Sequence, residues 1–325
     1  MNIKKLTAGI CCAALALGCL TGCSSESGAA SVDGAAAAAD YPSKEIQCIV
    51  PQNAGGGTDA LARAVCTPLE EIIGKPIVIV NSGSANGLVG TENIANADPD
   101  GYTLGVFSNT DVADFVYGDK GAEFDVDSFT YIAGLNSTGD ILLLKKDSEI
   151  ETLDDFIAYA KENPGKMTIG LPSAIQNLSL DLMNQALGIE TTGVVYEGGN
   201  KVFADILGGH IDAAILSAKF IAQAEEQDIT VLGLMLAERL NTFPDTPTFT
   251  EQGYDIVNPA VRMLVGPKGI PQEIVDIIVA DLEEGYEGAI ADGLLTIGEE
   301  PSLLTGDDLA SFLEEDYAMR EEMLK

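Results

Sequence analysis

The segment AGGGTD places three glycines, a threonine and an aspartate between an apolar strand and an apolar helix. The first turn of a helix has N–H groups without partners inside the helix, and it carries a partial positive charge. Because Gly55, Gly56 and Gly57 have no Cβ, a ligand can approach this backbone closely. Thr58 adds a hydroxyl donor, and Asp59 is placed to cap the helix or to tie the loop. The pattern predicts an anion site built mainly from main-chain amides.

A second loop repeats this design. The stretch VNSGSANGLVGTE, residues 80–92, again puts serine, asparagine and glycine between a predicted strand and a helix. In a parallel sheet both loops lie at the carboxyl edge, where ligands bind. No cluster of arginine or lysine lies in either loop, so a carboxylate held by backbone amides fits them best.

Two other interpretations of the glycines compete with this one. Gly55, Gly57 and Ala60 satisfy the dinucleotide pattern G-x-G-x-x-[GA], but the second strand ends at Asn81, where such a site needs an acid. No lysine follows the glycines, which excludes a P-loop. A structural turn without ligand remains as the second interpretation.

The composition leaves little material for catalysis. His210 is the one histidine, it follows two glycines, and a turn residue is the simpler interpretation of it. No G-x-S-x-G motif and no cysteine–histidine pair for nucleophilic catalysis are apparent. We therefore expect no enzyme, no cofactor and no metal site. The net charge of −34 also excludes nucleic acid as a partner, although a local site can still bind a small anion.

The first residues have the pattern of an exported lipoprotein. Lys4 and Lys5 precede an apolar segment, residues 6–20, that is too short to span a membrane. The following LTGC predicts cleavage before Cys23 and lipid on that cysteine, with an earlier ALGC at Cys19 as a competitor. Ordinary secretion with cleavage elsewhere is the alternative. Residues 1–22 are then a signal peptide and residues 23–40 a flexible tether. Loss of the signal removes two lysines and no acid, which changes the net charge from −34 to −36.

Two cysteines remain in the predicted mature chain. Cys48 lies in the first predicted strand and Cys66 in the first predicted helix, which should pack on that strand. They either form a disulfide in an oxidising compartment or are two small buried apolar residues.

Apolar strands and amphipathic helices alternate along the chain, which predicts an α/β fold with parallel-rich sheets and helices on both faces. The segments 134–147 and 258–269 are predicted to cross between two sheets. This gives a discontinuous lobe of residues 41–140 and 262–325, a second lobe of residues 141–261, and a ligand cleft between them. Predicted strands span residues 45–50, 76–80, 102–107, 140–146, 167–171, 192–197, 212–217 and 230–236, and predicted helices span residues 59–73, 88–97, 271–290 and 306–320, with a further helix from Thr152 to the NPG at 163–165.

Four segments carry a resemblance to a known family. They are YPSKEIQCIVPQNAGGGTDALARAV (41–65), GLVGTENIANADPDGYTL (87–104), VVYEGGNKVFADILGGHIDAAI (194–215) and FPDTPTFTEQGY (243–254). These segments resemble the Bug-type substrate-binding receptors of tripartite tricarboxylate transporters, from Tyr41 to the end of the chain. The resemblance implies a type II periplasmic-binding-protein-like fold that closes on a small carboxylate.

The resemblance also implies a set of ligand-binding residues. Matched by position, the first lobe offers its two loops and the segment after the third strand, and the second lobe offers residues of LPSAIQNLSLD and of VVYEG. The expected contacts are Gln52, Gly55, Gly56, Gly57, Thr58, Asp59, Ser84, Ala85, Asn86, Gly87, Asn109, Ser173, Gln176, Tyr196, Glu197 and Gly198.

The chain departs from the family pattern at several positions. Ser179 stands where the family often has histidine, and Gln52 stands where it often has an aromatic residue. Glu197 replaces lysine; it either attracts a cationic group of the ligand or points to water. Arg262 replaces an apolar residue, and either supplies positive charge to the site or pairs with a surface acid.

The expected function is that of an extracytoplasmic, lipid-anchored receptor. It would capture a small carboxylate-containing metabolite and deliver it, as a monomer, to the membrane subunits of a tripartite tricarboxylate-type transporter. One alternative is a receptor that presents its solute to a sensor kinase. Another is that the solute is zwitterionic or cationic.

Overall fold

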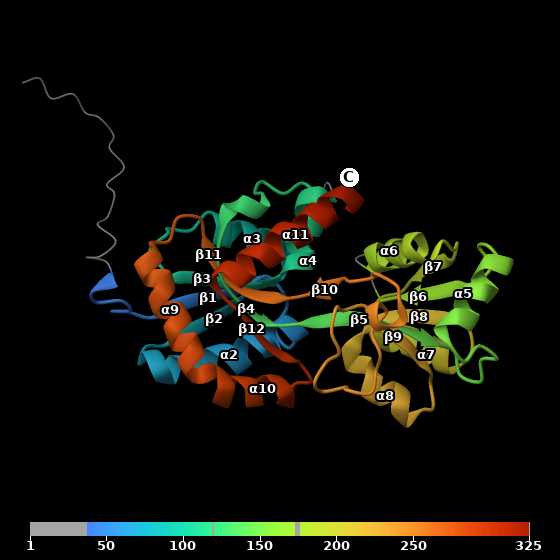
Figure 1. Ribbon diagram of the computed structural model, residues 1–325. Coiled ribbons are helices and arrows are strands. Elements are labelled where there is room, and N and C mark those ends of the chain that lie inside the picture. Colours follow the sequence, from blue (N-terminus) through green and yellow to red (C-terminus); the bar gives the residue numbers. More distant parts are fainter. Residues whose placement is uncertain (1–37, 119, 173–175, 325) are drawn as a thin grey trace, which may run out of the picture. The chain divides into compact units, whose positions relative to one another are not determined.

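The structure is a computed structural model that describes residues 38–118, 120–172 and 176–324. The strands form two six-stranded sheets with helices packed against them (Figure 1). The predicted signal peptide, the predicted lipid-bearing Cys23 and most of the predicted tether lie outside the described residues. Within the described residues, no helix has both the length and the apolar character that a membrane crossing requires.

The first sheet has the spatial order β12-β4-β11-β3-β1-β2. Its strand β1 is parallel to β2 and β3, whereas the pairs β3–β11, β11–β4 and β4–β12 are antiparallel. The bounds are β1 (Ile46–Val50), β2 (Ile77–Asn81), β3 (Thr103–Ser108), β4 (Phe129–Asn136), β11 (Arg262–Pro267) and β12 (Pro301–Leu304).

The second sheet has the order β10-β5-β8-β6-β7, and β9 also pairs with β5. Here β6 is parallel to β7 and β8, and the partners of β5 are antiparallel to it. The bounds are β5 (Thr138–Leu144), β6 (Thr168–Leu171), β7 (Thr192–Val195), β8 (Ala213–Ser217), β9 (Val231–Leu234) and β10 (Pro259–Ala260).

Both sheets are thus mixed, where the sequence predicted parallel-rich sheets. The reason lies in the two crossings. The chain passes from β4 to β5 at Ser137 and returns from β10 to β11 at Val261. Arg262, the first residue of β11, pairs with Ser108, the last residue of β3. A strand that enters at the carboxyl edge of its neighbour must run antiparallel to it.

Helices pack on both faces of each sheet because neighbouring strand residues point to opposite sides. In β1, Cys48 and Val50 join the core under one set of helices, and Ile49 joins the core under the other. The helices of the first sheet are α2 (Gly57–Ile73), α9 (Gln272–Gly285) and α10 (Ala291–Thr296) on one face, and α3 (Leu88–Ala95), α4 (Asn109–Tyr117) and α11 (Gly306–Leu324) on the other. The helices of the second sheet are α5 (Leu153–Glu162) and α6 (Asn177–Leu187) on one face, and α7 (Gly199–Leu207) and α8 (Ile221–Glu226) on the other.

Short turns complete the described elements. They are the 3₁₀ turns Ser84–Gly87, Val126–Ser128, Ala218–Phe220 and Thr250–Gln252, and a π turn at Tyr286–Ile290. The π turn divides the helix that the sequence predicted across residues 271–290, and Gly288 within it has non-helical dihedral angles. The strands β4, β11 and β12 and the helix α4 were not predicted as elements.

The two cysteines are free thiols in the structure. Cys48 and Cys66 are both buried in the core between β1 and α2. A hydrogen bond between the two side chains, together with burial, raises the pKa of the Cys48 thiol well above its ordinary value. Of the two interpretations of the sequence, the structure therefore contains the pair of buried thiols.

Candidate functional site

The glycine loop places the N-terminus of a helix, which has no side-chain cap, beside a cavity. Helix α2 begins at Gly57, and because its N-cap residue is Gly56, no side chain caps the first turn. The N–H groups of this turn therefore remain available to an anion. A Cβ on Gly57 would lie 3.5 Å from Nη2 of Arg262, so the guanidinium group stands beside the helix end. This arrangement can bind a carboxylate by backbone amides and one arginine.

Asp59 fixes the conformation of the glycine loop through hydrogen bonds. Its buried carboxylate accepts hydrogen bonds from the Gly55 N–H at 2.8 Å, from Arg63 at 2.9 and 3.1 Å, and from Asn81 at 3.0 Å. The hydrogen bond from Arg63, supported by the bonds from Gly55 and Asn81, lowers the pKa of Asp59 to about 2. Of the two roles that the sequence offered for Asp59, a cap or a tie, the structure shows the tie.

The second loop supports the first by close packing. Gly87 has a φ of +102°, and a Cβ there would lie 2.4 Å from the carbonyl oxygen of Pro51. Gly90 is similarly close, with 2.8 Å between its Cβ position and the Cα of Pro51. Residues 84–87 form a 3₁₀ turn, and neither Ser84 nor Gly87 is among the residues that line the cavity. The loop thus holds the backbone of the glycine loop in position.

The cavity has a volume of about 260 Å³ and opens between the two sheets. Pockets for drug-sized ligands span roughly 300–1,000 Å³, so this one suits a small metabolite. From the first sheet and its helices it is lined by Gln52, Gly57, Thr58, Ser108, Thr110, Asp111, Arg262 and Arg320. From the second sheet and the crossings it is lined by Thr138, Gly139, Asp140, Gln176, Ser217, Lys219, Asn258 and Ala260.

Arg262 is a basic residue that stands at the helix end and lines the cavity. Its Nε donates to the Thr58 hydroxyl at 3.3 Å, and its Nη1 pairs with Glu299 at 3.0 Å. Glu299 also accepts a hydrogen bond of 2.7 Å from Asn136, and the backbone N–H of Arg262 donates to that asparagine at 2.9 Å. Arg262 therefore both borders the cavity and pairs with an acid, which combines the two alternatives that the sequence left open.

Two carboxylates also border the cavity. Asp111, in the first turn of α4, accepts a hydrogen bond of 3.0 Å from Gln52. Asp140, in β5, accepts one of 2.6 Å from Ser179. Burial raises the pKa of both carboxyl groups, although Arg262 opposes the shift at Asp111, and Ser179 and Arg320 oppose it at Asp140.

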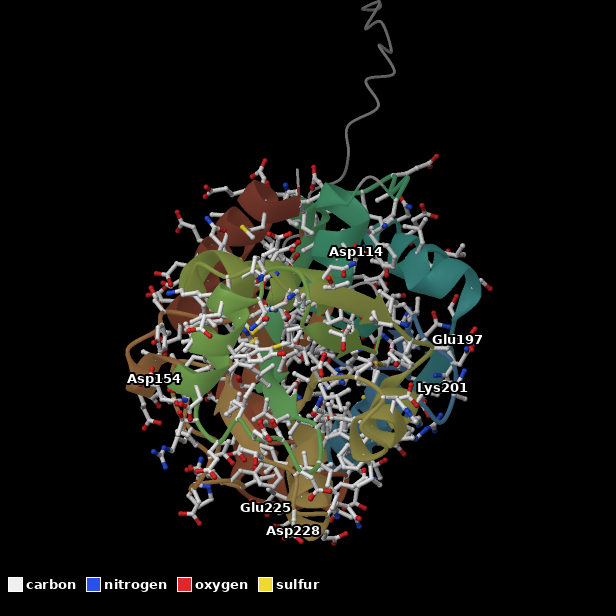
Figure 2. All side chains as sticks on the ribbon, turned by 90° about the vertical axis from the view of Figure 1, so that its right-hand side faces the viewer. Asp114, Asp154, Glu197, Lys201, Glu225 and Asp228 are labelled. Atoms are coloured by element: carbon white, nitrogen blue, oxygen red, sulfur yellow. The ribbon has the colours of Figure 1, made fainter. Side chains whose placement is uncertain are left out.

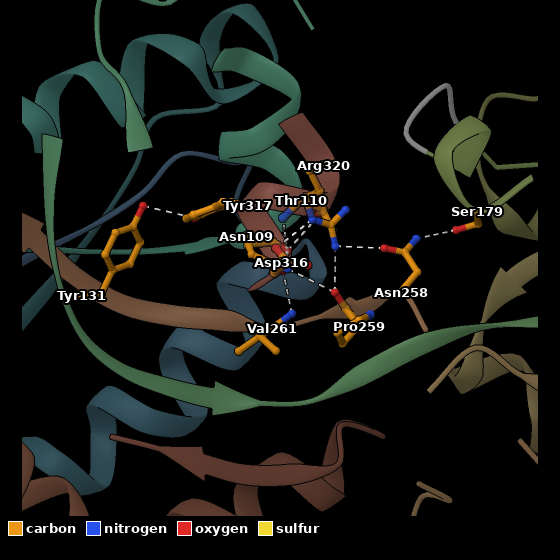
Figure 3. Close-up of polar contacts among 11 residues, drawn as sticks. Asn109, Thr110, Tyr131, Ser179, Asn258, Pro259, Val261, Asp316, Tyr317 and Arg320 are labelled. Atoms are coloured by element: carbon orange, nitrogen blue, oxygen red, sulfur yellow. Dashed lines mark hydrogen bonds and ion pairs between the residues drawn. The ribbon is translucent and has the colours of Figure 1, made fainter. Parts of the chain in front are cut away.

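Asn109 lies behind the cavity, although the sequence predicted a ligand contact. It is fully buried; its amide nitrogen donates to the Pro259 carbonyl at 3.1 Å and to Asp316 at 2.8 Å, and its oxygen accepts from the Val261 N–H at 2.9 Å (Figure 3). These bonds fasten the second crossing to the first turn of α4. Ser108, the residue before it, does border the cavity.

A buried arginine continues this network toward the second sheet. The Nε of Arg320 bonds Asp316 at 2.8 Å, and its Nη2 donates to Asn258 at 2.9 Å and to the Pro259 carbonyl at 3.0 Å. Asn258 in turn donates to Ser179 at 2.7 Å (Figure 3). The chain of bonds thus runs from α11 of the first sheet to α6 of the second.

The remaining predicted contacts lie elsewhere. Glu197 is 89% exposed at its side chain and pairs with Lys201 at 2.5 Å, at the edge of the molecule in Figure 2. Tyr196 donates to Asp205 at 2.7 Å, and Gly198 donates to the Pro172 carbonyl at 2.9 Å. None of these three borders the cavity as described. Ser173 lies outside the described residues, as do the side chains of Ala85 and Asn86.

Of the predicted residues, Gln52, Gly57, Thr58 and Gln176 line the cavity. The sequence reasoning missed Arg320, and a signal for it existed. Arg320 shares one helix face with Leu309, Leu313 and Tyr317, at helical spacing. A basic residue on a core-facing stripe indicates a buried ion pair, and Asp316 supplies it four residues earlier.

The described residues contain no group of three or more histidine, cysteine or acidic side chains that could hold a metal ion. Two sheets joined by two crossings, with a small polar cavity between them, define a two-lobe periplasmic-binding-protein fold.

Comparison with known proteins identifies the family. The model of the tripartite tricarboxylate transporter family receptor (TctC) matches residues 61–325, and the chain belongs to this family. Its members are extracytoplasmic solute receptors.

Individual relatives agree with this assignment. A UPF0065 protein of Bordetella pertussis is 31% identical over 287 residues, which cover 85% of this chain and 87% of that protein. A TctC solute-binding protein from Polaromonas, solved without ligand, has a TM-score of 0.80 at 26% identity. The match covers 87% of this chain and 99% of the Polaromonas chain. An R. palustris protein solved with adipate has a TM-score of 0.71 at 26% identity, with 87% and 97% of the two chains covered.

Proposed function

We propose that this protein captures a small carboxylate-containing metabolite in the cavity between its sheets and delivers it to a tripartite tricarboxylate-type membrane transporter. It breaks no bond in the solute. After removal of residues 1–22 it is anchored to the membrane by lipid on Cys23 and acts as a monomer. The lobes are residues 41–136 with 262–325, and residues 138–260, because the strands of the two sheets are separated at Ser137 and Val261; the first crossing, at Ser137, lies three residues before the predicted boundary at residue 140.

The helix end at Gly57 carries the proposal. Helix α2 is 17 residues long, begins with an uncapped glycine turn, and points this turn at a cavity that Arg262 also borders. Amides of a helix N-terminus and a guanidinium group both favour a carboxylate over a neutral solute. The related R. palustris protein solved with adipate supports the same class of ligand.

Binding would be coupled to movement of the lobes. The cavity wall contains residues of both sheets, so a ligand that contacts both walls stabilises the arrangement in which they face each other. Single residues, Ser137 and Val261, separate the strands of the two sheets at the crossings. Hinges of a few residues at element ends absorb such motion.

A thermal-shift panel tests the proposal. Succinate, malate, adipate and citrate are titrated against the purified protein at pH 7, with glucose and putrescine as neutral and cationic comparisons. At least one carboxylate should raise the unfolding midpoint in a saturable manner, because a ligand that binds only the folded state stabilises it by mass action. A folded protein that responds to none of the carboxylates would contradict the proposal.

A further inference from the structure

We propose that the ligand carries an ammonium group in addition to its carboxylate, and that Asp111 and Asp140 bind this group. This inference rests on the proposed function, because it adds a second recognition element to the same cavity. It assigns the cationic contact to the two walls of the cavity and not to Glu197, for which the sequence left open a cationic contact or a side chain that points to water.

The charges around the cavity are unequally paired. Arg262 has its counter-charge in Glu299 at 3.0 Å, and Arg320 has its counter-charge in Asp316 at 2.8 Å. In the described part of the chain, no lysine or arginine nitrogen lies within 4.0 Å of a carboxylate oxygen of Asp111 or Asp140. The hydrogen bonds found for these two acids come from neutral groups.

Arg320 adds to the electrostatics of the same cavity. Its side chain is only 2% exposed, yet it borders the cavity, and its Nε and Nη2 donate to Asp316, Asn258 and the Pro259 carbonyl. Its charge attracts Asp140, but its ion pair is with Asp316, so Asp140 keeps no cationic partner within ion-pair distance among the described residues.

The charges of the residues that line the cavity favour a ligand with a positively charged group. With both arginines neutralised by their partners, the cavity wall contains two acids, Asp111 and Asp140, and one further base, Lys219. A ligand with carboxylates alone would add negative charge to this excess. An ammonium group offsets it, since a partly buried charge is costly until an opposite charge or strong hydrogen bonds meet it.

The two acids stand on opposite walls, one in α4 and one in β5. An ammonium group has three N–H donors and no acceptor, so it can bond a carboxylate on each wall. Binding of this kind joins the two lobes directly. The carboxylate of the same ligand remains with Gly57 and Arg262.

The experiment compares matched pairs of small molecules that differ by one ammonium group. Isothermal titration at pH 7 gives the Kd of the purified protein for succinate and L-aspartate, glutarate and L-glutamate, and valerate and 5-aminovalerate. In at least one pair the aminated member should bind at least ten-fold more tightly. Asp111→Asn and Asp140→Asn should each reduce that ratio at least five-fold, while the amide oxygen still accepts the existing neutral hydrogen bond.

Two control variants make the result specific. Asp114→Asn makes the same change of charge one turn further along α4, outside this cavity, and Glu197→Gln tests the exposed acid that the sequence suggested. Both should leave the ratio unchanged.

Three results would overturn the inference. In the first, the non-aminated members bind equally well or better, which leaves the proposed function standing. In the second, the ratio is preserved in both cavity variants, which also leaves it standing. In the third, none of the six compounds binds to the folded protein. The proposed function fails as well only if the carboxylates of the preceding subsection also give no thermal shift.

Discussion

Replacement of Asp59 by asparagine should destabilise the protein by about 2 kcal/mol at pH 7. The pKa of this carboxyl group is lowered from 3.8 to about 2 in the folded protein, chiefly by Arg63. One pKa unit corresponds to about 1.4 kcal/mol, so the folded state favours the ionised form by roughly 2 kcal/mol. Asp59 is 3% exposed, but the side chain of Arg63 is 53% exposed, so solvent screens part of their attraction and about 2 kcal/mol is an upper value.

The dependence on pH has a definite sign. Because the folded pKa lies below the unfolded value, the stabilisation is fully present above pH 3.8 and is lost as the pH falls toward 2. The gap in unfolding free energy between wild type and Asp59→Asn should therefore shrink to about half near pH 3.

Urea unfolding followed by far-ultraviolet circular dichroism, at pH 7, 5 and 3, measures the gap. Asp292→Asn is the matched control, because Asp292 also lies in the first turn of a helix but is exposed. It should change the unfolding free energy by less than about 0.5 kcal/mol at each pH. A gap for Asp59→Asn that is equally small at pH 7, or one that does not narrow in acid, would refute the reasoning.

Three further predictions concern packing. Gly87→Ala should lower the thermal unfolding midpoint more than Gly55→Ala does. Both residues have a positive φ, but only a Cβ at position 87 would meet backbone, 2.4 Å from the carbonyl oxygen of Pro51. Equal losses of stability in the two variants would contradict this prediction. Arg320→Met should cost about 3–5 kcal/mol in urea unfolding, because its aspartate partner stays buried and unpaired; a cost below about 1 kcal/mol, typical of an exposed pair, would count against it. Alkylation followed by peptide mass mapping should leave Cys48 and Cys66 unmodified in the native protein and modify both after unfolding without reductant; protection that persists after unfolding would indicate a disulfide.

The helix end could be predicted because its signal is local. Three glycines between a strand and a helix leave a bare first turn, whatever surrounds them. The same locality explains why α5 was correctly predicted to begin after Thr152; as the N-cap, its hydroxyl accepts the Asp155 N–H at 3.2 Å. The alternation of strands and helices likewise predicted the α/β class.

Apart from Gln176, the residues that complete the cavity could not be assigned to one site from the sequence, because only tertiary contacts bring them together. Asp140, Asn258 and Arg320 are far apart in the sequence and meet through the crossings and α11. Strand direction was missed for a similar reason, since an apolar run such as that of β11 has the same pattern whether it enters from one edge of a sheet or the other.

Two of the contacts expected from family position, Asn109 and Glu197, are not among the residues that line the cavity. Asn109 follows the third strand as predicted, but its side chain is buried and accepts a hydrogen bond from the Val261 N–H in the second crossing. Glu197 lies at an exposed edge, where Lys201 in the next turn neutralises it. The partner of Asn109 is distant in the sequence and approaches only on folding, whereas Lys201 lies four residues after Glu197, a spacing that the sequence already contained.

The most direct test of the account is the affinity of Arg262→Gln for the carboxylate that gives the largest thermal shift. Arg239→Gln is the control, because Arg239 pairs with Glu251 on the surface away from the cavity. Isothermal titration should show one site per wild-type chain and a Kd at least ten-fold higher for Arg262→Gln, with the control unchanged. An unaltered Kd in a folded Arg262→Gln protein would contradict the claim that the carboxylate binds between the α2 helix end and Arg262.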